Sequence, residues 1–221
     1  MSHPINRIVQ CLPREFFQAL LEQMDAAFVR ALGLTRKHYQ EPEQFMMLGQ
    51  NRHAFCEEAF RVAAEAAALS NVSAHTEPAG GRFSLVTHGD VSLIRSNVQV
   101  HCGLPRASKF RQEFAALNAH LSPLQNDLFV DVAAPSAERI CGMVVVTANR
   151  RGYDQSVPAF AGLGVPRSDL TGWISLEPIT TILARYHDVD AAAHRQPEIK
   201  VEVRDRAVPR LKSGVTKTGA E

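Results

Sequence analysis

The stretch RICGMVVVTA, residues 139–148, decides the fold because it contains an unbroken apolar run, Met-Val-Val-Val, at residues 143–146. Three consecutive β-branched residues favour extended backbone, and an apolar run of this length is typical of a strand that is buried on both faces. Gly142 precedes the run, and residues 149–152 predict a turn after it. Such a strand needs a covering layer on each side, so we expect amphipathic helices packed against the sheet.

Two amphipathic helices are predicted before this strand. In residues 13–33 apolar residues recur three and four positions apart, with Pro13 at the first helical position and Gly33 as the stop. Residues 51–69 predict an alanine-rich second helix, on which Glu57 and Arg61 are spaced as an i,i+4 ion pair. The polar segment between the two helices, residues 34–48, contains a proline and predicts a loop with a short helical turn.

The periodicity changes from about 3.6 to 2 after residues 71–81, a Ser-, Thr-, Pro- and Gly-containing stretch that predicts a connection. Three short alternating segments follow and predict an antiparallel meander: residues 82–87, 91–96 and 97–102. A helix is predicted next, and further strands and a last helix complete the pattern: residues 108–121 (helix), 128–133, 139–148 and 157–166 (strands), a helix from Pro178, and an edge strand at 199–203.

This order of elements predicts an α+β fold with an antiparallel-rich sheet of five to seven strands, an N-terminal helical layer and two further helices. We expect residues 1–203 to form one compact domain, with residues 1–70 as the helical layer and 82–203 as the sheet and its helices. Residues 204–221 are basic and have little apolar surface to bury, so we expect a disordered tail.

The composition indicates an ordinary globular protein, at 45% hydrophobic and 21% charged residues with a net charge of +1. A charge this close to zero gives no global field that would attract nucleic acid or an anionic membrane, so an anion site must be local. No run approaches the roughly 20 apolar residues of a membrane span, and the first residues lack the apolar core of a signal peptide. The four cysteines form no C-x-x-C pair and are expected to be free thiols. We therefore expect a cytoplasmic protein that does not contact a membrane.

The usual catalytic and cofactor signatures are absent from the sequence, including the phosphate-binding glycine loop and the histidine pair of zinc proteases. The sequence gives no reason to expect a cofactor. A metal site is not expected either, because His88 and Asp90 flank a turn glycine and fit ordinary turn chemistry.

An anion site is predicted at the start of the helix near residue 108. Ser108 is a good N-cap, and Arg106, Lys109 and Arg111 place three cations at the positive end of the helix dipole, where cations are unfavourable. A bound phosphate would turn this arrangement into a site. The simpler interpretation is that these side chains are solvated surface charges, with Lys109 and Glu113 as an i,i+4 pair.

The sequence therefore supports two functional hypotheses. The first is a non-enzymatic binding module for a phosphate-bearing partner, including nucleic acid, or for a protein partner. The alternative is a divalent-metal-dependent nuclease with Glu58, Asp90 and His101 as catalytic residues, although residues 99–101 lack the acid and lysine that such sites use. Whether the protein is an enzyme is left open by the sequence.

Overall fold

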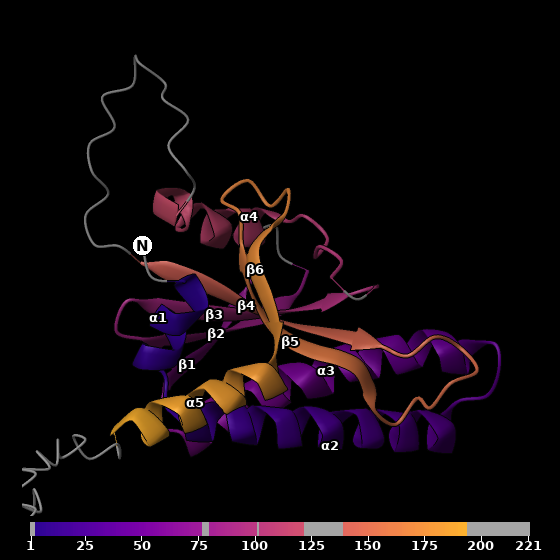
Figure 1. The fold of residues 1–221 in the computed structure, drawn as a ribbon. Helices are drawn as coiled ribbons and strands as arrows, with labels where there is room; N and C mark the ends of the chain where they lie inside the picture. The colour runs from indigo at the N-terminus through magenta and orange to yellow at the C-terminus, as the bar shows by residue number, and fades with distance from the viewer. Residues whose placement is uncertain (1–2, 77–79, 101, 122–138, 194–221) are drawn as a thin grey trace, which may run out of the picture.

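The computed structural model describes residues 3–76, 80–100, 102–121 and 139–193, with side chains described up to residue 186. Within these residues the protein has the α+β fold, with five helices and one six-stranded sheet (Figure 1). The strands lie in chain order: β1 (Ser70–His75), β2 (Arg82–His88), β3 (Val91–Val98), β4 (Ile140–Ala148), β5 (Pro158–Pro166) and β6 (Trp173–Pro178). The helices are α1 (Pro4–Cys11), α2 (Arg14–His38), α3 (Glu43–Ala66), α4 (Lys109–Ala116) and α5 (Ile179–Ala193).

Strand β4 is buried on both faces, which confirms the prediction from its apolar run. Val144 and Val146 belong to the core beneath the long helices, whereas Met143 and Val145 belong to a second core on the opposite face. All four side chains are at most 1% exposed. Because each fully buried aliphatic side chain contributes roughly 1.5–3 kcal/mol, this strand anchors both layers of the fold.

Helices cover the two faces of the sheet unequally (Figure 1). Helices α1, α2, α3 and α5 lie on one face, where Phe16 packs edge-to-face against Phe17 and Phe60 at centroid distances of 5.0 and 6.2 Å. The short α4 covers part of the other face, where Phe110 stacks on Phe83 of β2 at 4.3 Å. The predicted N-terminal helical layer is therefore present, and α4 and α5 correspond to the two further helices.

The sheet is antiparallel at every pairing except that of β3 with β4, which is parallel. Parallel neighbours need a crossover connection, because the chain must return to the start of the next strand. Helix α4 lies in this connection and provides the cover for the second face.

The long helices differ from their predicted bounds. Helix α2 does not stop at Gly33 but continues to His38, and α3 already begins at Glu43, so most of the predicted loop at residues 34–48 is helical. A glycine inside a helix costs only about 1 kcal/mol relative to alanine, and the packing of α2 against α3 outweighs this cost. The chain leaves α2 at Tyr39, whose backbone is extended.

The predicted meander is shifted by one strand. The stretch at residues 71–81 was expected to be a connection, but it contains β1, whose residues pair with β2 throughout their length. The two predicted segments at residues 91–96 and 97–102 are largely one strand, β3, because Ser96 and Asn97 continue the parallel pairing with β4. Sheet pairing here overrides the weak strand propensity of serine and asparagine.

Helix α1 and strand β6 were not predicted, whereas β5 and the start of α5 lie where the sequence placed them. The predicted strands at residues 128–133 and 199–203 and the predicted tail at 204–221 lie outside the described residues.

Candidate functional site

The residues of the predicted anion site lie at the start of α4 but engage one another. Ser108 has extended backbone at the N-cap position, yet its hydroxyl accepts no capping hydrogen bond. Arg111 Nη1 instead donates to the carbonyl of Arg106 at 2.9 Å and to Ser108 Oγ at 3.3 Å. Lys109 Nζ lies 4.0 Å from the carboxylate of Glu113, and both side chains are about 60% exposed. The predicted i,i+4 pair is therefore present, and phosphate binding here stays a prediction.

Arg111 is directed toward the interior of the protein. Its guanidinium lies over the ring of Phe110, 4.8 Å from the centroid, and its Nε is buried without a hydrogen-bond partner. Burial lowers the pKa of Arg111, and the positive charge of Arg95 lowers it further, while Glu57 opposes both effects. The start of α4 is thus electrostatically coupled to a buried ion pair beneath it.

That ion pair joins α3 to β3 at a place where the sheet separates. Backbone pairing of β2 with β3 runs from His88↔Val91 only to Leu85↔Ile94. Beyond this point Glu57 Oε2 accepts the backbone N–H of Ser84 at 2.8 Å, and Glu57 Oε1 accepts Arg95 Nε at 2.9 Å. The carboxylate therefore takes the place of the neighbouring strand as the partner of β2.

The two terminal nitrogens of Arg95 also have hydrogen-bond partners. Arg95 Nη1 donates to Asn97 Oδ1 at 2.6 Å, and Nη2 donates to His53 Nδ1 at 2.7 Å. Because an arginine only donates, Nδ1 of His53 must be unprotonated in this arrangement. Burial and the charge of Arg95 lower the pKa of His53 accordingly. Sequence reasoning paired Glu57 with Arg61, but Glu57 pairs with Arg95, and Arg61 Nη1 donates to Ser84 Oγ at 2.9 Å.

The residues of the nuclease hypothesis engage separate partners. Glu58 lies 3.6 Å from Arg30 on the exposed side of α3 and α2. Asp90, in the turn between β2 and β3, accepts hydrogen bonds from Arg7 and from the thiol of Cys11. Partial burial works against ionisation of Asp90, but these two hydrogen bonds prevail and lower its pKa. His101 lies outside the described residues, and no group of three histidine, cysteine or acidic side chains within the described part of the chain could hold a metal ion.

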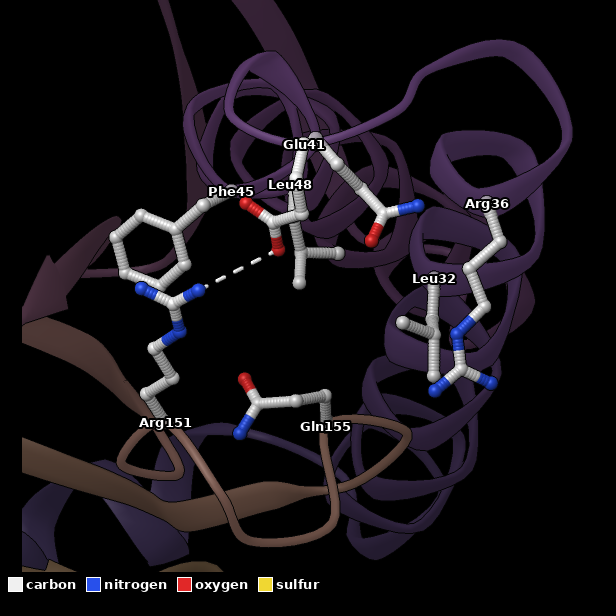
Figure 2. Close-up of a pocket in the computed structure, with 8 residues that line it drawn as sticks. Leu32, Arg36, Glu41, Phe45, Leu48, Arg151 and Gln155 are labelled. Carbon is white, nitrogen blue, oxygen red and sulfur yellow. Dashed lines mark ion pairs between the residues drawn. The ribbon is translucent and has the colours of Figure 1, made fainter.

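A solvent-reachable hollow lies elsewhere, between α2, α3 and the β4–β5 connection, and sequence reasoning did not identify it (Figure 2). Its volume is about 110 Å³. It is lined by residues from three separate segments: Leu32, Arg36, Glu41, Gln44, Phe45, Leu48, Arg151 and Gln155. The end of α2, the start of α3 and the β4–β5 connection meet at the same end of the molecule (Figure 1). We refer to this feature as the α2–α3 hollow.

Two arginines face the α2–α3 hollow from different walls (Figure 2). Arg36 lies in the last turn of α2, where a cation complements the helix dipole. Arg151 lies in the predicted turn after β4, with its guanidinium 3.6 Å from the carboxylate of Glu41. Arg36 has no hydrogen bond or ion pair with any described residue, although its charge adds to the hydrogen bonds from Ser156 that lower the pKa of Asp154. The hollow therefore has a cation on each of two walls, and Arg36 has spare hydrogen-bond donors.

A buried arginine of α3 fixes the β4–β5 connection, which forms one wall of the hollow. Arg52 of α3 is 7% exposed, and its Nη2 donates to the backbone carbonyl of Gln155 at 2.5 Å and to Gln155 Oε1 at 3.0 Å. The side-chain amide of Gln155 donates in turn to carbonyls of the β4–β5 connection, including that of Arg150 at 2.9 Å. Arg52 also lies over the ring of Phe28, 4.8 Å from its centroid. These contacts fix the β4–β5 connection against α3, so the wall that carries Arg151 is preorganised.

Two other hollows have less cationic linings. One, of about 210 Å³, lies beside α4, and its lysine, Lys109, already lies near Glu113. The other, of about 380 Å³, lies beyond the end of β4 and is more open, with Arg150 as its one charged lining residue. Of the three, the α2–α3 hollow combines two guanidinium groups with an apolar wall.

No helix in the described residues is both long enough and apolar enough to span a membrane. The chain matches no protein-family model, no curated protein and no solved structure. Any function must therefore be inferred from the geometry of the protein itself.

Proposed function

We propose that this protein is a binding module whose partner carries an anionic group, phosphate or carboxylate, and that the α2–α3 hollow holds this group. One observation carries the proposal: Arg36 and Arg151, from segments far apart in the sequence, line the same hollow. Guanidinium groups present several donors in a fixed fork that suits phosphate and carboxylate oxygens, and paired arginines are a common device for binding them.

The ion pair between Glu41 and Arg151 leaves Arg151 able to bind a ligand oxygen. The side chains of Glu41 and Arg151 are 57% and 74% exposed, and an exposed pair of this kind contributes only about 0–1 kcal/mol. A ligand oxygen can therefore recruit Arg151 at little cost. Leu32 and Leu48 provide an apolar wall beside the cations, which excludes water from one side of a bound anion and strengthens its interaction with them.

The test is a titration of the ¹⁵N-labelled full chain with inorganic phosphate and, separately, with acetate, followed by amide chemical shifts. We expect saturable shifts around the α2–α3 hollow with dissociation constants on the order of millimolar, as befits ligands of so few atoms. Arg36→Gln should abolish them. Lys37→Gln is the matched control, because Lys37 is exposed in the same turn of α2 but does not line the hollow.

Two results would overturn the proposal. One is the absence of saturable shifts at the hollow with either anion. The other is a response that survives Arg36→Gln and is lost in Arg111→Gln, which would place the anion at the start of α4. The nuclease alternative is favoured by no contact in the described residues. A separate thermal-unfolding measurement with and without magnesium addresses it, because a metal that binds only the folded state raises the melting temperature.

A further inference from the structure

The rim of the α2–α3 hollow exposes a large apolar side chain next to its cations. Phe45 lines the hollow and is 57% exposed. The guanidinium of Arg151 lies 5.6 Å from the centroid of the Phe45 ring. The cationic and apolar surfaces are thus contiguous, and contiguous exposed apolar side chains are a mark of interaction sites.

The size of the hollow limits what can enter it. Sites for cofactors and other small molecules typically occupy about 300–1,000 Å³, whereas this hollow has a volume of about 110 Å³. It has room for the head of one side chain and cannot enclose a nucleotide. Most of a larger partner would therefore lie outside the hollow, against Phe45.

The charge of the hollow matches one carboxylate. Its lining contains two arginines and one glutamate, which gives a net charge of +1. A single carboxylate between Arg36 and Arg151 balances this charge, whereas a doubly charged phosphate exceeds it. Glu41, at 3.6 Å from Arg151, would also repel the second charge of a phosphate.

From this combination we infer that the partner is a protein segment in which an acidic residue adjoins an apolar residue. The acidic side chain enters the α2–α3 hollow between Arg36 and Arg151, and the apolar neighbour packs on Phe45. This inference rests on the proposed function, because it names the partner of the same site. The charged contact fixes which residue of the segment enters the hollow. The apolar contact buries surface area that a free anion lacks.

The experiment compares three probes on the ¹⁵N-labelled full chain: acetyl-Leu-Glu-Leu-amide, acetyl-Leu-Gln-Leu-amide and inorganic phosphate. We expect the glutamate peptide to shift amides of the hollow and of the first turns of α3. The glutamine peptide should bind about threefold to tenfold more weakly, because it lacks the charge but keeps the apolar contacts. Arg36→Gln should remove the difference between the peptides, and Lys37→Gln should preserve it.

A rim variant separates the two parts of the surface. Phe45→Ser should weaken the glutamate peptide several-fold and leave phosphate binding unchanged, since Phe45 is exposed and its ring contributes apolar area. An unchanged melting temperature and an unchanged spectrum elsewhere show that this variant folds.

Each remaining outcome overturns the inference in a distinct way. Equal binding of the two peptides shows that the cations are not used. Saturable phosphate binding without peptide binding leaves the proposed function standing and refutes the protein partner. A single-stranded oligonucleotide that shifts the same amides at lower concentration than the peptide points to nucleic acid instead. The absence of shifts with every probe refutes both proposals.

Discussion

The buried ion pair between Glu57 and Arg95 offers a direct test of the forces that hold the sheet to α3. We predict that Arg95→Met destabilises the protein by about 3–5 kcal/mol, the usual cost of removing one partner of a buried pair. The side chain of Arg95 is 0% exposed and that of Glu57 is 10% exposed, so solvent cannot replace the lost partner. The carboxylate of Glu57 would keep the backbone N–H of Ser84 as a donor but would lose its counter-charge.

This loss is large in relation to the whole protein. Domains are typically stable by about 5–15 kcal/mol, so the substitution removes roughly a third to a half of an average value. For a chain of this size, 1 kcal/mol corresponds to roughly 2–4 °C, and we expect the melting temperature to fall by roughly 6–20 °C. Urea unfolding followed by circular dichroism measures the free energy of unfolding directly.

The matched control is Glu58→Gln, one residue along the same helix. Glu58 and Arg30 are 45% and 43% exposed at 3.6 Å, so this substitution should cost less than about 1 kcal/mol. The double variant Glu57→Met with Arg95→Met removes both desolvated charges together. Its loss in the free energy of unfolding should therefore be smaller, by at least about 2 kcal/mol, than the sum of the losses in the two single variants. An Arg95→Met cost no greater than that of the control, or strict additivity in the double variant, would refute the reasoning.

Four further predictions concern single positions. The free energy of unfolding should fall as the pH drops from 7.5 to 5. Below about pH 6.5 His53 binds a proton in the unfolded chain, whereas its lowered pKa keeps it neutral in the folded protein. Urea titrations at several pH values should show that His53→Gln loses this part of the pH dependence. Asn118→Ala should cost about 3 kcal/mol or more in urea unfolding, because the buried amide makes three hydrogen bonds of 2.8–2.9 Å to the backbone of β4 and β5. Gly33→Ala should raise the free energy of unfolding by about 0.5–1 kcal/mol, because a Cβ at this helical position meets nothing within 4 Å; a loss would show that the glycine is needed. Gly164→Ala should cost roughly 1–3 kcal/mol and alter the fluorescence of Trp173, the single tryptophan, because the new Cβ would lie 2.5 Å from its ring; an unchanged emission spectrum would contradict this.

The elements that the sequence predicted well are those with a strong local pattern. The apolar run of β4 could be satisfied only by burial on both faces, and the apolar stripe of α2 could be satisfied only against another layer. Elements with weak local patterns were missed. Strand β1 consists of Ser, Asn, Val, Ser, Ala and His and is extended because β2 pairs with it along its whole length.

Tertiary contacts, more than local sequence signals, determined where the helices and strands end. Gly33 is a good helix stop in isolation, yet α2 continues through it because packing against α3 outweighs the preference of one glycine. The Ser96–Asn97 pair is a good turn signal, yet both residues remain in β3 because β4 pairs with them.

The candidate binding residues likewise divide into those that the sequence indicates and those that only the tertiary structure identifies. From the sequence, Arg106, Lys109 and Arg111 could be recognised as cations at a helix start, because that depends on neighbours in the chain. That Arg111 is partly buried within reach of the charge of Arg95, while Arg36 faces a hollow together with Arg151, depends on residues far apart in the sequence.

The sequence by itself thus determined the α+β class, the doubly buried central strand and the helical layer, because periodicity and burial are properties of short segments. Only the tertiary structure decided which charges are paired and which remain available. Glu57 has Arg61 four residues away on the same helix, but it pairs with Arg95 because the separation of β2 from β3 leaves a buried space that this ion pair fills. An electrostatic partner is chosen by distance and burial in three dimensions, and neither is encoded in the spacing of residues along the chain.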